Sequence, residues 1–470
     1  MRKVGSGSSG SRILIETPRR GGAECGEGLS FPRYLCNALA LGDIQVMNIC
    51  MLVDNDCSHD ARVLREAAAL AAPGPRLAHT VIICAVSDSG LPRCEKRDGF
   101  EIRRVGFDSW KKRLRRRRPS GGDSSFGHAE SPVARSGSAT MIRQALGVLL
   151  DPQETRSIAR AVREVLDDFR ADVCHAHDLP MLGPAARLAQ RDHAKLVYDS
   201  HELFVDRAMH PQPAPFVRAA WMRRERQLIR RCDAVITVND ALADALARRY
   251  GIERPTVVMN APSVSHAPGD ADRLLLRQAI GAADSDKLLL CLGAIIPHRG
   301  LEIAVDAIAS LADCRLVIMG YGSDHYRGVL ESRARSRGVA DRLSFFGPVP
   351  HEDVVRYASG ADVGLIPLEP VSESYRLATP NKLFEFIHAH VPIVASDLPE
   401  MRRIISEEDV GITFTPGAAA SLAASIRVAL DDQAARARWR ENAAAAAQRY
   451  NWAVESRKLC DVYERLASIS

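Results

Sequence analysis

The segment 288–308 (LLLCLGAIIPHRGLEIAVDAI) places a glycine and an arginine where a phosphate could bind. Gly293 ends an apolar run that predicts a buried strand, and a glycine lets the backbone approach a ligand closely. Arg299 stands where the next helix is expected to begin, and helix N-termini favour anions. A guanidinium can also hold a phosphate through two hydrogen bonds. The spacing therefore predicts a phosphate site, although an exposed loop arginine would produce the same pattern.

A second strand-to-helix region, 378–401 (ATPNKLFEFIHAHVPIVASDLPEM), carries a lysine and a glutamate. We expect Thr379 to cap a helix whose first residue is Pro380. Lys382 then lies in the first turn and Glu385 three residues later, so the two side chains share one face. The lysine and the helix N-terminus can bind a diphosphate, and the carboxylate can accept hydrogen bonds from ribose hydroxyls. The alternative is a surface ion pair worth about 0.2–0.5 kcal/mol.

These two regions together can stabilise a diphosphate as a leaving group. When the bond between C1 of a sugar and a diphosphate breaks, negative charge grows on the phosphate oxygens. Proteins stabilise that charge with a carboxylate-bound metal ion, or with basic side chains and helix N-termini. Arg299 and Lys382 belong to the second arrangement. The sequence therefore favours a nucleotide-diphosphate sugar as the substrate.

Short apolar runs that alternate with helical stretches must position these residues. The runs are continuously apolar, which indicates strands buried on both faces of parallel sheets. The first half has such runs at 48–53, 80–86, 171–177, 195–199, 233–238 and 256–260, and the second half has them at 287–293, 314–320, 342–347, 361–368 and 391–397. Helical patterns are expected at 60–72, at 156–169 and from about residue 418 onward. The pattern predicts an α/β protein with two Rossmann-like, doubly wound domains and a cleft between them.

The expected domain boundaries follow breaks in this alternation. They are 1–46 for a disordered extension or a mis-assigned start, 47–262 for an acceptor-side N-terminal domain, 263–285 for a linker, 286–445 for a nucleotide-sugar-binding C-terminal domain, and 446–470 for a C-terminal helix that packs back on the N-terminal domain. Residues 108–140 are expected to be a basic, flexible insertion.

Composition places the chain among cytoplasmic globular proteins. Hydrophobic residues make up 46% of the chain and the net charge is only +5. The eleven cysteines include no C-x-x-C pair and several lie in apolar runs, which predicts reduced, buried thiols. No apolar run reaches the roughly 18 residues that a membrane span needs.

The basic run 111–118 has seven basic residues in eight positions. A solvated insertion is one explanation, and an arm that binds anionic lipids at the inner face of the plasma membrane is the alternative. Nucleic acid is not expected as a partner, because no aromatic residues are interleaved with the run.

Two adjacent motifs resemble those of a known protein family. The motif P-N-K-L-F-E-F, from Pro380 to Phe386, is followed by P-x-V-A-S-D-x-P-E at 392–400. This sequence resembles glycosyltransferase family 4, the retaining GT-B enzymes, and the likeness extends through 318–324, 345–368, 198–204 and 59–70. The resemblance implies a GT-B fold, retention of anomeric configuration, and catalysis without a metal ion or other cofactor. The acceptor, a glycan, a glycolipid or a small metabolite, stays open.

The resemblance also assigns residues to the donor. It implies that Arg299 and Lys382 contact the diphosphate and that Glu385 contacts the ribose, so Glu385 counts among the catalytic residues. It implies that the backbone around Asn381 and Leu383 faces the phosphates, together with Gly293. Gly320 and Gly322 follow the strand that lies beneath the nucleoside in such proteins.

On the acceptor side, the resemblance places His201 opposite the donor sugar, as a second catalytic residue. His177 and Asp178 end the preceding strand and are expected to line the same cleft, as is Glu202. A structural histidine at a strand end is the alternative for His201.

Two further motifs suggest metals but are better explained otherwise. The triplet 54–56 spells D-x-D, and we expect Asp56 to belong to a loop on the acceptor side and not to a metal site. In the run 174–177, Cys174 and His175 point to opposite faces of a strand and no second ligand cluster is apparent, so no zinc site is expected.

Three positions depart from the family pattern. Many relatives have a glutamate where this chain has Leu377, an arginine where it has Ala294, and a glycine where it has His390. These departures keep two alternatives open: an inactive GT-B scaffold that still binds a ligand, and an epimerase that acts on the same nucleotide sugars.

Overall fold

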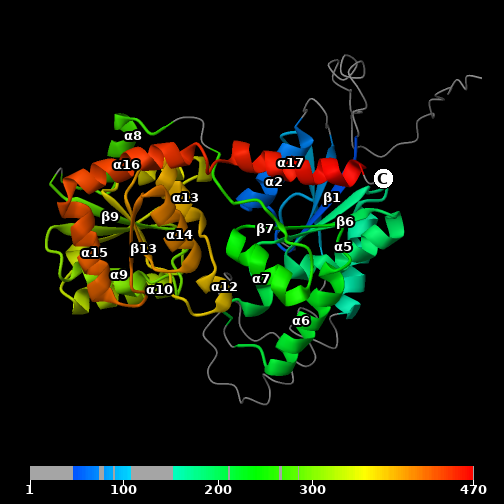
Figure 1. Ribbon diagram of the computed structural model, residues 1–470, viewed down its shortest axis with the longest axis horizontal. Coiled ribbons are helices and arrows are strands. Elements are labelled where there is room, and N and C mark those ends of the chain that lie inside the picture. Colours follow the sequence, from blue (N-terminus) through cyan, green and yellow to red (C-terminus); the bar gives the residue numbers. More distant parts are fainter. Residues whose placement is uncertain are drawn as a thin grey trace, which may run out of the picture. The chain divides into compact units, whose positions relative to one another are not determined.

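The computed structural model describes residues 46–72, 79–87, 90–106, 152–209, 212–263, 267–283 and 285–468 (Figure 1). The expectations for 1–46 and 108–140, including the basic run 111–118, therefore fall almost entirely outside the described residues. Among the residues described, no helix is both long and apolar enough to cross a bilayer.

The first sheet has eight strands in the order β3-β4-β2-β1-β5-β6-β7-β8. They are β1 (Asn48–Val53), β2 (Thr80–Val86), β3 (Cys94–Arg97), β4 (Phe100–Val105), β5 (Val173–His177), β6 (Lys195–Ser200), β7 (Ala234–Thr237) and β8 (Thr256–Val257). All neighbouring pairs are parallel except β3 with β4. The run at 256–260 forms only two strand residues, so this strand is shorter than predicted.

The hairpin formed by β3 and β4 was not predicted. Residues of β3 alternate between exposed and half-buried, and those of β4 between buried and half-buried over its first four residues, instead of forming an apolar run; β3 lies at the sheet edge. Asp98 and Gly99, which connect the two strands, both have positive φ. Such a D-G pair between alternating residues is the sequence signal that identifies a tight hairpin.

The second sheet has six parallel strands in the order β11-β10-β9-β12-β13-β14. They are β9 (Lys287–Leu292), β10 (Cys314–Met319), β11 (Leu343–Phe346), β12 (Val363–Ile366), β13 (Ile393–Ser396) and β14 (Gly411–Phe414). Strands β10 and β11, which follow β9 in the chain, lie on one side of β9, and the later strand β12 lies on its other side. The strand order therefore reverses between β9 and β12. Ligands of open α/β sheets bind at such a switch point, outside the carboxyl ends of the strands. In the first sheet the corresponding point lies between β1 and β5.

Helices cover both sheets. In the first half they are α2 (Ala61–Ala71), α5 (Asp178–Asp192), α6 (Pro215–Ile229) and α7 (Asp240–Tyr250), with a further helix over 152–165. In the second half they are α8 (Asp270–Ala279), α9 (Leu301–Ile308), α10 (Asp324–Ser336), α11 (Val354–Ala358), α12 (Glu373–Arg376), α13 (Asn381–His388), α14 (Pro399–Glu408), α15 (Ala419–Asp431) and α16 (Gln433–Ala447).

The segment that connects the two halves and the last helix of the chain both pack against a sheet. The expected linker 263–285 contains α8, whose Leu276 is fully buried in the core of the second sheet, so the connection is shorter than predicted. The last helix, α17 (Trp452–Ser468), packs beside α2 (Figure 1). Its Leu459 and Tyr463 are buried in the core cluster that contains β1 and β2.

Candidate functional site

The loops after β9 and β10 pack so closely that both need glycine. Gly293 has φ +104, and a Cβ on Gly320 would lie 2.0 Å from the Gly293 carbonyl oxygen. A Cβ on Gly322 would lie 2.4 Å from the Cβ of Ile295, whose backbone N–H donates to Tyr321 at 2.7 Å. These contacts hold the carboxyl ends of β9 and β10 together, next to the switch point between β9 and β12. The glycines predicted from the sequence therefore lie at one edge.

Arg299 comes directly before α9, which begins after Gly300. Its guanidinium carbon lies 5.2 Å from the ring centroid of Tyr375, an arrangement in which the aromatic face attracts the cation. The buried Nε of Arg299 has no hydrogen-bond partner among the described residues. Arg299 is thus fixed in place while retaining a donor for a ligand.

Helix α13 begins one residue later than predicted. Pro380 is the N-cap and Asn381 the first helical residue, whereas Thr379 accepts a hydrogen bond from Asn239 Nδ2 at 3.0 Å and does not cap the helix. The amide of Leu383 donates to the Pro380 carbonyl at 2.9 Å. The amides of Asn381 and Lys382 precede the first possible intrahelical acceptor, as the first amides of any helix do. A ligand anion would meet these two amides before that of Leu383.

Lys382 reaches from α13 to the loop after β9. Its Cε and Nζ lie 3.9 Å from the position of a Cβ on Gly293. Burial, together with the nearby Arg299 cation, lowers the pKa of Lys382 to about 8. Two cations close enough to repel each other in a partly dehydrated site form a favourable environment for an anion.

Glu385 lies one turn deeper on α13. Burial raises the pKa of Glu385 to about 7, and the cations Lys382 and Arg65 oppose that rise. Arg65 comes from α2 and donates to the Asn260 side chain, which in turn donates to Asn381 Oδ1 at 2.9 Å. Arg65 was not predicted from the sequence, because its contacts connect segments far apart in the chain.

In the first half, His201 lies between two carboxylates. Its Nε2 is 2.9 Å from Asp199 Oδ2 and its Nδ1 is 3.2 Å from Asp178 Oδ2. Although burial opposes charge on the ring, the two carboxylates hold the pKa of His201 well above its ordinary value. Since both ring nitrogens face carboxylates, His201 is arranged to donate hydrogen bonds and not to act as a base.

The other predicted acceptor-side residues occupy different environments. Asp178 has φ +61, an uncommon conformation for a residue other than glycine, and its Oδ1 accepts from the His201 amide at 3.1 Å. His177 is only 1% exposed and lies behind His201, so it does not line an open surface. Glu202 accepts from Ser374 Oγ at 3.0 Å. Asp56 accepts hydrogen bonds from Ser58 within its own loop.

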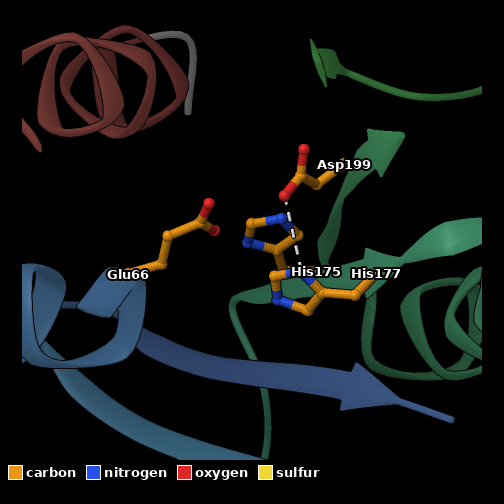
Figure 2. Close-up of side chains that lie close together, drawn as sticks. All are labelled: Glu66, His175, His177 and Asp199. Atoms are coloured by element: carbon orange, nitrogen blue, oxygen red, sulfur yellow. Dashed lines mark ion pairs between the residues drawn. The ribbon is translucent and has the colours of Figure 1, made fainter. Parts of the chain in front are cut away.

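Four buried residues form a cluster behind His201, and the sequence did not predict that they meet. They are Glu66 from α2, His175 and His177 from β5, and Asp199 from β6 (Figure 2). Arg62 of α2 contacts Asp199 through two hydrogen bonds, of 2.8 and 2.9 Å. The alternation of His175 and His177 along one strand is the only part of this cluster with a local sequence signal.

Two of the three positions that depart from the family pattern have structural explanations, and nothing in the structure explains Ala294. Leu377 is 6% exposed and packs into the core of the first half, while its carbonyl accepts from Asn239 at 2.8 Å. His390 follows α13 with φ +54, a conformation that glycine adopts more easily.

Comparisons with known proteins agree with this architecture. Residues 272–446 match the family model described as glycosyl transferases group 1, and residues 60–262 match that of the glycosyl transferase 4-like domain. The chain is 29% identical over 236 residues to a phosphatidyl-myo-inositol mannosyltransferase from Mycobacterium leprae. That match covers 47% of this chain and 58% of the relative, so it spans little more than half of the relative's length.

Solved structures share the fold at low sequence identity. Sucrose-phosphate synthase from Thermosynechococcus elongatus matches with a TM-score of 0.71 and 18% identity, covering 90% of this chain and 100% of that one. Anabaena HepE in complex with UDP and glucose matches with a TM-score of 0.64 and 16% identity, covering 89% and 100%. Both likenesses concern the arrangement of the backbone.

Proposed function

Since this chain belongs to glycosyltransferase family 4, with its two-domain GT-B fold, we propose that it transfers a sugar from a nucleotide-diphosphate donor to an acceptor. The observation that carries the proposal is the position of Lys382 and Arg299 around the Gly293 loop, at the N-terminus of α13. Two cations and the first amides of a helix favour a diphosphate, and Glu385 one turn deeper suits ribose hydroxyls. The UDP complex of HepE, a protein of the same fold, supports a nucleotide donor.

In the proposed reaction the bond between the sugar C1 and the diphosphate oxygen breaks, and the acceptor oxygen bonds to C1. The electron pair of the broken bond stays on the diphosphate, whose charge Lys382, Arg299 and the α13 amides stabilise. The acceptor's proton passes to the departing phosphate, which is the route we propose for transfer with retention and without a metal ion at the diphosphate. His201 would act on the donor sugar through the charge of its protonated ring, because Asp199 and Asp178 already engage both ring nitrogens.

The acceptor is proposed only by class, as a glycan, a glycolipid or a small metabolite. The mannosyltransferase relative has a lipid substrate in its name, and the basic run 111–118 suits an anionic membrane surface. Both features favour a lipid-linked acceptor at the cytoplasmic face of a membrane.

The proposal is tested by turnover with UDP, GDP, ADP and dTDP sugars in the presence of lipid and glycan acceptor extracts. We expect release of one nucleoside diphosphate together with a labelled acceptor, and a loss of this release in Arg299→Ala and Glu385→Ala. Arg335→Ala, on the exposed part of α10, is the matched control and should retain turnover. Undiminished turnover in both site variants would contradict the site assignment. A new free sugar formed without acceptor would identify an epimerase.

A further inference from the structure

Glu66, His175, His177 and Asp199 converge on one point inside the first half of the molecule. Each offers a ligand atom, and these four atoms lie within 4.8 Å of one another (Figure 2). All four side chains are at most 1% exposed. Two residues apart on β5, the histidines point to the same face of the sheet, and their rings stack with centroids 4.4 Å apart.

Several polar atoms of this cluster are buried without a hydrogen-bond partner among the described residues. They are Nε2 of His175, Nε2 of His177 and both carboxylate oxygens of Glu66. Arg62 Nε lies 3.0 Å from Glu66, but its hydrogen is directed to Asp199 Oδ2 at 2.8 Å. Glu66 Oε1 therefore has an ion-pair contact, whereas the two histidine Nε2 atoms and Glu66 Oε2 have neither a hydrogen bond nor an ion pair among the described residues. Buried polar groups in proteins are normally paired, so these three atoms indicate a missing partner.

The opposite side of each histidine is already held. Nδ1 of His175 lies 2.8 Å from the hydroxyl of Tyr463, which α17 contributes. Nδ1 of His177 lies 3.4 Å from Asp199 Oδ2 and 3.3 Å from His201 Nε2. Histidines that bind a metal commonly use one nitrogen for the ion and the other for such an orienting contact.

The charges in the cluster also suit a cation. Two carboxylates, Glu66 and Asp199, face one guanidinium, Arg62, which leaves a negative balance when both histidines are neutral. His201 and Asp178, on the side of the cluster that faces the solvent, form an ion pair of their own. Asp199 Oδ2 already contacts Arg62, His201 and His177, whereas Oδ1 accepts from Arg62, so the second lone pair of Oδ1 is the one available to an ion.

We propose that Glu66, His175, His177 and Asp199 bind a divalent transition-metal ion of the zinc type. Two imidazole nitrogens and two carboxylate oxygens are ligands that zinc accepts, whereas magnesium and calcium prefer oxygen alone. Bonds of about 2.0–2.1 Å place tetrahedral ligands about 3.3 Å apart, so the most distant pair would move together by about 1.5 Å. Four protein ligands with full burial characterise a structural site without an open position for substrate.

This ion would connect α2, β5 and β6, and through Tyr463 it would hold α17. It would also fix Asp199, which contacts His201 at 2.9 Å. The site belongs to the first sheet and its helix α2, whereas Lys382 and Arg299 lie on a helix and a loop of the second half. The inference therefore goes beyond the proposed function and does not depend on sugar transfer.

The test measures metal in the full chain, purified without chelator, by mass spectrometry. We expect about one equivalent of zinc per chain, and at least tenfold less in His175→Gln and Glu66→Gln. Two matched controls should keep the metal: Glu225→Gln, which alters a buried carboxylate bonded by Tyr198 and Tyr250, and His388→Gln, which alters a buried histidine bonded to Tyr450.

A second measurement remains informative when a variant does not fold. The chelator-treated wild-type chain is titrated with Co²⁺, and we expect a one-to-one end point with the visible absorption of a tetrahedral ion, together with an increase in the unfolding temperature. Absence of stoichiometric metal in the purified chain and of a one-to-one Co²⁺ end point would overturn the proposal. Metal retained equally in the two cluster variants would overturn it as well.

Discussion

Lys382 and Glu385 lie one turn apart on α13, and burial shifts the pKa of each toward neutrality. The pKa of Lys382 falls to about 8, with Arg299 adding to the effect of burial, and the pKa of Glu385 rises to about 7. A bound diphosphate favours the charged lysine, and ribose hydroxyls favour the charged carboxylate. With the proposed site, we therefore expect binding of a nucleotide to depend on pH near neutrality.

We expect the affinity for the nucleoside diphosphate to be highest between about pH 7 and 8. Above this window Lys382 loses its proton, and below it Glu385 gains one, so affinity falls on both sides by up to about tenfold per pH unit. Calorimetric titration from pH 5.5 to 9.5 measures this profile. Lys382→Arg should remove the alkaline limb and Glu385→Gln the acidic limb. A profile that is flat in the wild-type chain would contradict the assignment of both residues.

Glu385 should act on the ribose and not on the phosphates. We expect Glu385→Gln to weaken binding of the nucleoside diphosphate about 10- to 150-fold, equivalent to about 1.5–3 kcal/mol for hydrogen bonds to a charged group. Inorganic pyrophosphate should bind the variant as well as the wild-type chain, or more tightly, because a negative charge near Lys382 is removed. Equal losses for both ligands in competition titrations would place Glu385 elsewhere.

At the scale of elements, the position of Arg299 depends on the glycine that follows it. Gly300 has φ +70, and a Cβ there would lie 1.7 Å from the backbone oxygen of Pro367. The loop between β9 and α9 is therefore held against the segment after β12, and a side chain at residue 300 would displace it.

We expect Gly300→Ala to lower the free energy of unfolding by more than about 1 kcal/mol and to weaken nucleotide binding, because Arg299 moves with the loop. Gly328→Ala is the matched control, since a Cβ at this position in α10 meets nothing within 4 Å. In a helix interior that change stabilises by about 0.5–1 kcal/mol. Thermal unfolding of the two variants should thus give shifts of opposite sign. A Gly300→Ala variant with wild-type stability would show that the close approach to Pro367 is not needed.

Sequence patterns predicted the elements that are buried and continuously apolar. The strands β1, β2, β9 and β10 coincide with predicted runs, because a parallel strand covered on both faces has a distinctive composition. The edge hairpin of β3 and β4 and the strand β14 were missed, since their residues are only partly buried. The boundary at Thr379 was wrong by one residue because Thr379 contacts Asn239 instead of capping α13.

The proposed donor residues could be singled out from the sequence because each lies at a strand-to-helix junction with a local signal; their role stays a prediction. The cluster behind His201 could not, because its members are brought together by tertiary structure. Arg62 and Asp199 are 137 positions apart, and His175 and Tyr463 are 288 positions apart. A single sequence contains no pattern that connects such distant positions.

For the molecule as a whole, the proposed donor residues belong to the loops and helices of the second sheet, and the residues expected on the acceptor side belong to those of the first. The basic run 111–118 lies between β4 and β5 in the chain, within the half assigned to the acceptor. Donor binding and membrane binding should therefore be separable by mutation.

Deletion of 111–118 should lower the affinity for vesicles that contain anionic lipid, because each basic residue near such a surface contributes about 1 kcal/mol. Sedimentation with anionic and with neutral vesicles measures the change, and added salt should weaken the wild-type interaction in the same way. Nucleotide affinity should be unchanged. Vesicle binding that is unchanged by the deletion would contradict a role of 111–118 in membrane binding.

Thermal unfolding in the presence of UDP, GDP, ADP and dTDP sugars tests whether Arg299, Lys382 and the N-terminus of α13 form a nucleotide-diphosphate site. A ligand at 100 times its dissociation constant stabilises the fold by about 2.7 kcal/mol, a shift of a few degrees for a chain of this size. We expect such a shift with one nucleotide class and its loss in Arg299→Ala and Lys382→Ala. No shift with any nucleotide sugar, or an equal shift in both variants, would contradict it.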